Sequence, residues 1–372
     1  MILALALLLL AVWIGMALLG FWKCDQRDDR VATRSPAVWP EVVAIVPARD
    51  EADLIARSIA SLAAQDYPGP FRIILVDDNS SDGTASRVRE LGSRRIEILN
   101  GGPLAAGWTG KLWAVSQGIA AAGTPQFLWL TDADIEHSPD TLRNLVGIAT
   151  AGDFTLVSLM AKLRCRSLPE RALIPSFIYF FMMLYPFNWV NRRGPVAAAA
   201  GGCLLLSRQA LEAAGGIGAI RGELIDDCAL GRLLKRQGPV WLGLTDRSRS
   251  IRAYDDISQI AAMIARSAFA QLHYSLPLAM LSVAGLGLIF LAPPIVALSS
   301  NGLVATVAGA TLLLMLALYQ PILRFYRLSP FWALGLPLVM LFYVGCIIMS
   351  VVQHFGGRGG TWKGRTQALS AP

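Results

Sequence analysis

The stretch Phe127-Leu-Trp-Leu-Thr-Asp-Ala-Asp-Ile-Glu-His137 decides how the rest of the chain is interpreted. Its apolar first part, Phe127 to Leu130, predicts a buried strand, and the apolar run stops before Asp132 and Asp134. In open α/β sheets, ligands bind beyond the carboxyl ends of the strands. Two carboxylates one residue apart are hard oxygen ligands suited to Mg²⁺ or Mn²⁺, which would bridge to nucleotide phosphates. The pattern alone also fits a turn that caps a helix starting near Ser138-Pro139-Asp140.

Two upstream strands are predicted to end in similar polar groups. Glu41–Pro47 and Phe71–Val76 are short apolar runs, and helical spacing of apolar residues lies between them and after them. This alternation predicts a largely parallel α/β sheet covered on both faces. The polar residues that follow the two runs are Arg49, Asp50, Glu51, Asp77 and Asp78. Because parallel strands end at one edge, we expect these groups and the Asp132/Asp134 pair to converge on one ligand.

The composition indicates a membrane protein. The chain has 372 residues, of which 54% are hydrophobic and 16% charged, and its mean hydropathy is +0.50. Residues 1–22 form an apolar run without a basic n-region or a small-x-small cleavage site, which predicts an uncleaved transmembrane anchor rather than a signal peptide. Three later runs also have spanning length: Leu276–Ser299, Leu303–Leu323 and Phe331–Gln353. Residues 169–190 predict an interfacial helix, with a buried core helix as the alternative.

The basic residues lie beside these apolar runs. The net charge is +7, and its distribution is typical of the positive-inside pattern facing anionic lipid rather than of a nucleic-acid binder. The residues concerned are Lys23, Arg27, Arg30, Arg34, Arg324 and Arg327. Five cysteines without a Cys-x-x-Cys pair predict free thiols in a reducing compartment. We therefore expect the middle of the chain to face the cytosol.

The expected organisation is an anchor at 1–22, a linker at 23–40, a catalytic domain at 41–273, an apolar region at 274–353 and a basic tail at 354–372. Three C-terminal spans would put the basic tail on the opposite side from the domain, against the positive-inside pattern. We therefore expect one run to be re-entrant or interfacial. Leu276–Ser299, which contains Pro293-Pro294, is the best candidate.

Three motifs resemble those of family 2 glycosyltransferases, which have the GT-A fold, a Rossmann-like and mostly parallel α/β architecture. They are Val46-Pro-Ala-Arg-Asp-Glu51, Val76-Asp-Asp-Asn-Ser-Ser-Asp-Gly-Thr84 and Thr131-Asp-Ala-Asp134. Gly107-Trp-Thr-Gly-Lys111, the terminal spans and the Trp362-Lys-Gly-Arg365 tail are more similar to the bacterial hopene-associated glycosyltransferase family, with carotenoid and ceramide (sphingolipid-type) glycosyltransferases further off.

The resemblance implies transfer of a single sugar from a UDP-sugar to the hydroxyl of a lipid, a hopanoid, by inverting displacement. It places the enzyme in the bacterial inner membrane with its catalytic domain facing the cytosol. It assigns Pro47, Ala48, Asp50 and Asp78 to the uridine part of the donor, beside Glu51 of the same motif. It assigns Asp132 and Asp134 to Mg²⁺ or Mn²⁺, with Asp132 also contacting the donor. Bound there, the cation neutralises charge on the departing UDP. Lys111 is either a diphosphate ligand or a solvated lysine at a helix start.

The segment Arg221–Lys235 predicts a helix with Asp226 and Asp227 at its start, where the dipole favours ionised carboxylates. Neighbouring helical residues point about 100° apart, so we expect at most one of them to face the pocket squarely. Inverting transfer needs one general base. The family pattern is Glu-Asp followed by a leucine and an arginine, with the second acid as base, and this acid matches Asp227.

The motif of processive synthases, Gln-x-x-Arg-Trp, is replaced here by Gln271-Leu-His-Tyr274, which disfavours a polymerase. His137 and His273 are interpreted as polar surface residues without a metal role. Two other classes stay open. A nucleotidyltransferase could use the same sheet but has no need for four apolar segments. A non-catalytic membrane protein with a nucleotide-sensing domain explains those segments, yet their interiors lack charged residues. Release of UDP separates the transferase from both.

Overall fold

The computed structural model describes residues 1–357, 359–362 and 365–366. The chain divides into two compact units. A helical unit comprises residues 1–24, 165–188 and 254–360, and a sheet unit comprises residues 25–164 and 189–253 together with the chain end from Thr361. Of the predicted basic tail, residues 358, 363–364 and 367–372 lie outside the described residues. Thr361–Trp362 (β9) and Arg365–Thr366 (β10) pair antiparallel.

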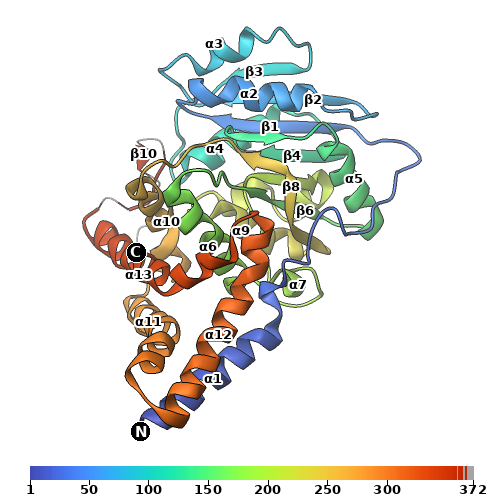
Figure 1. Ribbon diagram of the computed structural model, residues 1–372. Helices are drawn as coiled ribbons and strands as arrows, with labels where there is room; N and C mark the ends of the chain where they lie inside the picture. Colours follow the sequence, from blue (N-terminus) through green and yellow to red (C-terminus); the bar gives the residue numbers. More distant parts are fainter. Residues whose placement is uncertain (358, 363–364, 367–372) are drawn as a thin grey trace. The chain divides into compact units, whose positions relative to one another are not determined.

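An eight-stranded sheet in the order β3-β2-β1-β4-β7-β6-β8-β5 forms the centre of the sheet unit (Figure 1). The strands β3, β2, β1 and β4 are parallel, as predicted. Strand β7 is antiparallel to β4 and β6, and β5 is antiparallel to β8, so the second half of the sheet is mixed. The strands are β1 Val42–Ala48, β2 Phe71–Asp77, β3 Ile96–Asn100, β4 Phe127–Thr131, β5 Ile135–His137, β6 Leu156–Lys162, β7 Cys203–Ser207 and β8 Val240–Ser250.

Helices cover both faces of the parallel half, which explains why every residue of β1 is buried. The apolar sides of α2 and α5 share one core cluster with Val42, Ala44 and Val46 of β1. Helix α4 packs on the other face, where a Cβ at Gly118 would lie 2.5 Å from Ile45 Cγ2. The helices of this unit are α2 Ala52–Ala63, α3 Thr84–Arg89, α4 Gly110–Ala121, α5 Thr141–Gly152, α8 Arg208–Ala213, the 3-10 helix η2 Ile217–Ile220 and α9 Asp226–Lys235; α7, Phe187–Val190, lies at the border of the two units.

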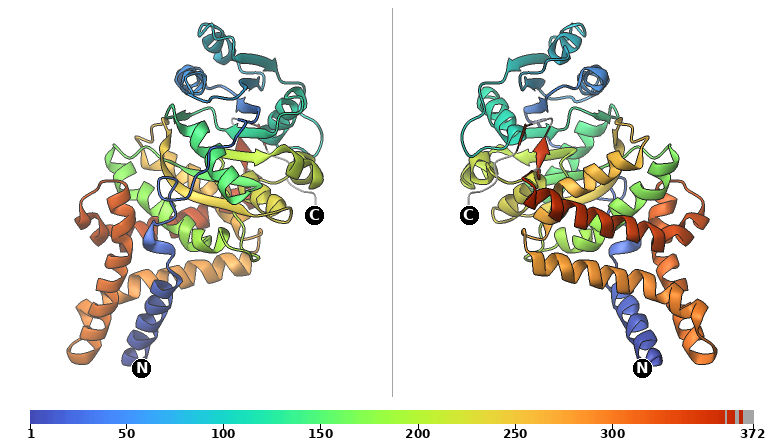
Figure 2. Two further views of the ribbon diagram at one scale, coloured as in Figure 1. Left: turned by 90° about the vertical axis from the view of Figure 1, so that its right-hand side faces the viewer. Right: turned by 90° about the vertical axis from the view of Figure 1, so that its left-hand side faces the viewer.

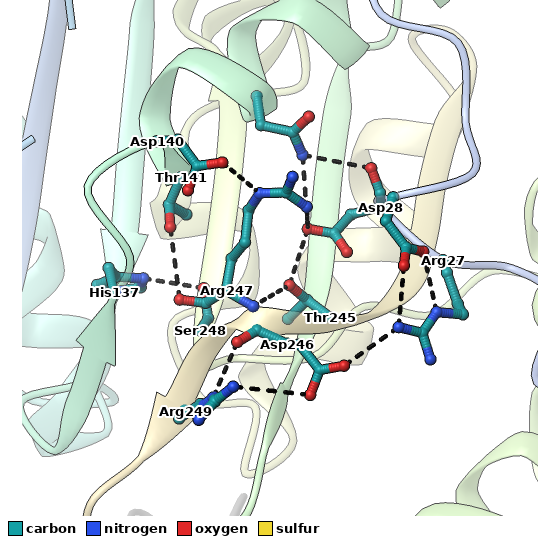
Figure 3. Close-up of polar contacts among 12 residues, drawn as sticks. Arg27, Asp28, His137, Asp140, Thr141, Thr245, Asp246, Arg247, Ser248 and Arg249 are labelled. Atoms are coloured by element: carbon teal, nitrogen blue, oxygen red, sulfur yellow. Dashed lines mark hydrogen bonds and ion pairs between the residues drawn. The ribbon is translucent and has the colours of Figure 1, made fainter. Parts of the chain in front are cut away.

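Part of the predicted linker lies against β8 (Figure 3). The Asp28 N–H donates to the Leu244 carbonyl at 3.1 Å, and Arg27 forms a parallel bridge with the same residue. The buried Asp28 carboxylate accepts hydrogen bonds from Thr245 Oγ1 at 2.8 Å and Arg247 Nη1 at 3.0 Å. These contacts attach the segment that follows the N-terminal helix to the longest strand of the sheet.

The helical unit contains the apolar runs. Its helices are α1 Ile2–Leu19, the 3-10 helix η1 Phe21–Lys23, α6 Leu168–Leu184, α10 Ile257–Gln271, α11 Leu276–Ser299, α12 Gly302–Phe325, the 3-10 helix η3 Pro330–Gly335 and α13 Leu336–Phe355. Within the described part of the chain, five stretches are long and apolar enough to cross a membrane: these are α1, Leu168–Val190, α11, α12 and Pro330–Phe355. More than half of the apolar window in Leu168–Val190 is buried inside the protein. That burial fits the buried-helix alternative, while a position at a membrane interface stays a prediction.

Helix α1 is packed into this unit and lies beside α12 (Figure 2). The fully buried Trp13 donates its indole N–H to the Ile289 carbonyl of α11 at 3.1 Å and packs edge-on against Phe290. Pro293, four residues after Ile289, has no N–H to give that carbonyl. Trp13 of another helix thus gives the Ile289 carbonyl the donor that Pro293 cannot supply, and α11 continues through the proline pair.

Candidate active site

Three parallel strands bring the predicted motifs to one edge of the sheet. Strand β1 ends at Ala48, which pairs with Asp77 at the end of β2, and β4 ends beside β1 at Thr131. The side chains that follow these strands therefore lie on neighbouring loops, as the strand pattern predicts. Figure 1 shows β2, β1 and β4 as adjacent arrows of the sheet.

The loops after β1 and β2 are held together by their own polar side chains. Asp50 adopts a left-handed backbone conformation with φ of 49°, and its Oδ1 accepts the Ser81 N–H at 2.8 Å. Asp78 is fully buried, and its carbonyl accepts from Arg49 Nη1 at 2.6 Å. These contacts hold the loops after β1 and β2 together. Recognition of a nucleoside by Asp50 and Asp78 stays a prediction, because the Asp78 side chain is fully covered by protein in this structure.

The two aspartates after β4 each contact a cationic side chain. Lys111 Nζ lies 2.9 Å from Asp132 Oδ1. Arg252 Nε donates to Asp134 Oδ2 at 2.7 Å, and Arg252 Nη2 contacts both oxygens of Glu51 at 2.6 and 2.7 Å. Glu51, which belongs to the motif assigned to the sugar-nucleotide donor, therefore lies against Arg252. Arg252 was not among the predicted site residues, since an arginine after a strand carries no signal of its own.

The helix start of α9 completes the site from the other side of Lys111. Lys111 Nζ lies 3.1 Å from Asp226 Oδ2. Asp227 Oδ2 accepts the Gly201 N–H at 2.9 Å, and its Oδ1 accepts the Cys228 N–H at 2.7 Å. Asp226 and Asp227 both line one pocket with Lys111 and Asp132, so the expectation that at most one of them faces the pocket squarely stays a prediction. Lys111 holds Asp226, whereas two backbone N–H groups hold Asp227.

Close backbone packing holds α9 against the segment before β7. A Cβ at Gly231 would lie 2.7 Å from the Ala198 carbonyl carbon, so only glycine lets α9 approach the segment before β7 this closely. A Cβ at Gly201 would lie 3.4 Å from Lys111 Nζ and 3.5 Å from Asp227 Oδ2. The segment before β7 forms one wall of the acidic site, and regular β-structure begins only at Cys203.

Burial and mutual charge shift the ionisation of this cluster. Burial, reinforced by the negative charge of Asp226, raises the pKa of Asp227 to about 6 against the opposing effect of Lys111. Burial also raises the pKa of Asp132. Although burial disfavours the charged lysine, Asp132 and Asp226 raise the pKa of Lys111 above its ordinary value. A buried carboxylate with a pKa near 6 is still largely ionised at neutral pH, which suits a general base.

The donor set is compatible with a divalent cation. Carboxylates outnumber cationic side chains here, with Glu51, Asp132, Asp134, Asp226 and Asp227 against Lys111 and Arg252. A diphosphate would meet net negative charge unless a cation accompanied it. No group of three or more His, Cys, Asp or Glu side chains suited to a metal occurs in the part of the chain that the structure describes. Mg²⁺ is commonly held by one or two carboxylates plus substrate phosphates, and the Asp132/Asp134 pair matches that use.

His137 does not lie at the surface, contrary to expectation. It is 4% exposed, its ring nitrogens lie 2.9 Å from Thr131 Oγ1 and 2.9 Å from Ser248 Oγ, and its ring packs edge-on against Trp129. Burial lowers the pKa of His137 to about 3. The pairing of β5 with β8 covers this side chain, which makes His137 a neutral link between strands (Figure 3).

Comparisons with known proteins show what this fold is similar to. Residues 43–215, a little less than half of the chain, match the family model described as glycosyl transferase family 2. This region is therefore a glycosyltransferase family 2 domain, an enzyme domain with the GT-A α/β fold.

Two particular proteins are similar to this chain. Beta-monoglucosyldiacylglycerol synthase of Synechocystis sp. is 30% identical over 115 residues, which are 30% of this chain and 23% of that protein. The match thus spans about a quarter of the length of this curated relative. The mannosyltransferase PcManGT from Pyrobaculum calidifontis, solved in complex with GDP-Man and Mn²⁺, has a TM-score of 0.61 and 20% identity, and the alignment covers 95% of this chain and 99% of that one. At this identity the likeness concerns the fold.

Proposed function

We propose that this protein transfers a single sugar from a nucleotide-sugar donor to the hydroxyl of a lipid acceptor by inverting displacement. The observation that carries the proposal is the position of Asp227. This carboxylate, with its raised pKa, lies in one pocket with Lys111 and Asp132, at the sheet edge where the donor motifs end. A base on one side of a donor site is the arrangement that direct displacement needs.

Each side chain has a defined task in this mechanism. The edge formed by Asp50 and Asp78 binds the nucleoside, which the sequence motifs predict to be uridine. Asp132 and Asp134 would hold Mg²⁺ or Mn²⁺, which supplies Lewis-acid neutralisation of the departing diphosphate when bound. Asp227 keeps lone pairs beyond its two backbone hydrogen bonds, so it can accept the proton of the acceptor hydroxyl as that oxygen attacks the anomeric carbon. Lys111 limits the repulsion between the acids.

A lipid acceptor is supported by two independent features. The chain has stretches of spanning length at both ends, and the matched relative from Synechocystis sp. is named for glycosylated diacylglycerol. The hopanoid acceptor rests on the resemblance of the sequence motifs, and the relative's name makes diacylglycerol the second acceptor to test. We propose the bacterial inner membrane as the location, with the sheet unit facing the cytosol, because the basic residues follow the positive-inside pattern.

The donor nucleoside is the least constrained part of the proposal. The motifs predict a UDP-sugar, whereas the similar mannosyltransferase was solved with GDP-Man. The test is nucleoside diphosphate release by the purified full-length chain in detergent with Mn²⁺ or Mg²⁺. A panel of UDP- and GDP-sugars is combined with no lipid, a hydroxylated triterpenoid, or diacylglycerol. Lipid-dependent release identifies the donor and the acceptor class.

The matched variants Asp227→Asn and Asp226→Asn test the base. Loss of transfer in the first, with UDP binding retained, supports the assignment, and the second is expected to keep most activity. Normal turnover in Asp227→Asn would refute the base assignment. A folded protein that binds UDP but releases none with any donor would favour the alternative, a nucleotide-sensing membrane protein. Pyrophosphate release from a sugar phosphate and a nucleoside triphosphate would indicate a nucleotidyltransferase.

A further inference from the structure

Arg252 reaches the donor site from a segment far away in sequence. It follows β8, and the preceding residue, Ile251, donates its N–H to the Asp134 carbonyl at 2.9 Å. Just before it, Ser250 pairs with Ile135 in the antiparallel β5–β8 ladder. The backbone that carries Arg252 is therefore attached directly to the loop that carries Asp134.

The guanidinium of Arg252 joins two motifs of the donor edge. Its Nε donates to Asp134 Oδ2, and its Nη2 contacts both oxygens of Glu51. The Glu51 side chain is 9% exposed and that of Asp134 is 17% exposed, so both carboxylates depend on a cation for compensation. Because Arg252 uses only Oδ2 of Asp134, the second carboxylate oxygen, Oδ1, remains as a ligand for a metal ion.

A second arginine–carboxylate ion pair provides a solvent-exposed comparison for Arg252. Arg57 pairs with Glu136, two residues after Asp134, through both carboxylate oxygens. Its side chains are 62% and 36% exposed, and exposed ion pairs of this kind contribute little to stability. The Arg57–Glu136 pair has similar chemistry but lies in solvent and involves no residue of the predicted site, so it serves as a matched control.

We propose that Arg252 is a positioning residue of the donor site. It orients Asp134 for a divalent cation bound with a nucleoside diphosphate, and Glu51 anchors the guanidinium rather than contacting the donor. The inference rests on the proposed function, since it assigns the cation to that donor site. Partners behind a metal ligand fix its orientation, and their loss typically lowers metal affinity about 10–100-fold.

The test is Mn²⁺ binding to the full-length protein in detergent, followed by electron paramagnetic resonance with and without UDP or GDP. Arg252→Gln is expected to weaken Mn²⁺ binding about 10–100-fold in the presence of nucleotide. Arg252→Lys recovers part of the affinity, because lysine keeps the charge but cannot contact both carboxylates in a fork. Arg57→Gln leaves the affinity unchanged. Circular dichroism confirms that each variant is folded.

Glu51 provides an independent check through a double-mutant cycle. If Glu51 acts through Arg252, then Glu51→Gln weakens Mn²⁺ binding, and adding Arg252→Gln produces little further loss. In transfer assays the Arg252 variants raise the KM for the metal–donor complex, while kcat largely recovers at saturating Mn²⁺. A purely structural role would instead lower the amount of active protein and leave KM unchanged.

Three results would overturn the inference. Unchanged or tighter Mn²⁺ binding in Arg252→Gln would mean that the arginine competes with the cation. Equal loss of UDP affinity with and without EDTA would mean that Arg252 contacts the diphosphate directly. If the wild-type protein binds no Mn²⁺ with either nucleotide, there is no bound cation for which Arg252 could orient Asp134. In that case lipid-dependent UDP or GDP release, measured separately in EDTA, still decides the proposed function.

Discussion

Transfer is expected to decline in acid with a midpoint near the pKa of Asp227. Burial and the charge of Asp226 raise this pKa from 3.8 to about 6. A base with a pKa near 6 is about nine-tenths ionised at pH 7 and about one-tenth ionised at pH 5, so the rate falls roughly tenfold over that interval. An aspartate with an ordinary pKa near 3.8 would lose less than about one-tenth of its ionised fraction.

The assay is the initial rate of nucleoside diphosphate release at donor and lipid concentrations well below their KM values across this pH range, because that rate follows the ionisation of the free enzyme. Two neighbours should move the midpoint in opposite directions. Lys111 lowers the pKa of Asp227, so Lys111→Met shifts the midpoint upward, while Asp226→Asn removes a charge that raises it and shifts the midpoint downward. A flat wild-type profile down to pH 5, or shifts in the same direction, would refute the assignment of Asp227 as the titrating base.

The variant Asp227→Asn separates catalysis from folding. Loss of a general base typically costs about 10²–10⁴-fold in rate. The folded-state pKa of Asp227 is raised, so its ionisation reduces stability as the pH rises from 3.8 through about 6, and the penalty is fully present at pH 7. The neutral asparagine avoids that penalty, but its single oxygen can accept from only one of the two backbone N–H groups that the Asp227 carboxylate binds. Because the two effects oppose each other, we expect the variant to melt near the wild-type temperature at neutral pH, and a large drop would show that lost activity reflects unfolding.

Three further predictions concern stability and metal. Trp13→Phe leaves the Ile289 carbonyl without its donor and should cost about 1–3 kcal/mol in thermal unfolding; Trp22→Phe is the control, because the Ala17 carbonyl that Trp22 contacts also accepts from Gly20. Burial lowers the pKa of His137 from 6.5 to about 3, so the free energy of unfolding should decrease as the pH falls from 6.5 towards 3. The decrease should be smaller in His137→Gln, and equal acid sensitivity of the two proteins in thermal unfolding would contradict this. Chelation with EDTA should abolish transfer and added Mn²⁺ should restore it, as measured by UDP release, whereas full activity in EDTA would exclude the metal assignment.

Local patterns predicted much of this protein correctly. The apolar runs around β1, β2 and β4 each stop at polar residues, and the structure places those ends at one edge of a parallel sheet. The apolar run Leu276–Ser299 coincides with α11. These features follow from hydrophobicity and strand period, which neighbouring residues determine among themselves. The place of Asp227 at a helix start was also predicted correctly, while its role as base, which the family resemblance implies, stays a prediction.

Only the tertiary structure decided which side chains meet. Arg252 and Asp134 are 118 residues apart in sequence and Trp13 and Ile289 are 276 apart, and each contact depends on the order of strands or the packing of helices. The sequence likewise left His137 on the surface, because its burial depends on the pairing of β5 with β8. The sequence around a charged or aromatic side chain does not indicate its distant partner, since burial and ion pairing are properties of the assembled fold. The sequence thus determined the edge of the sheet and its acids, and the fold determined the cations that hold those acids in place.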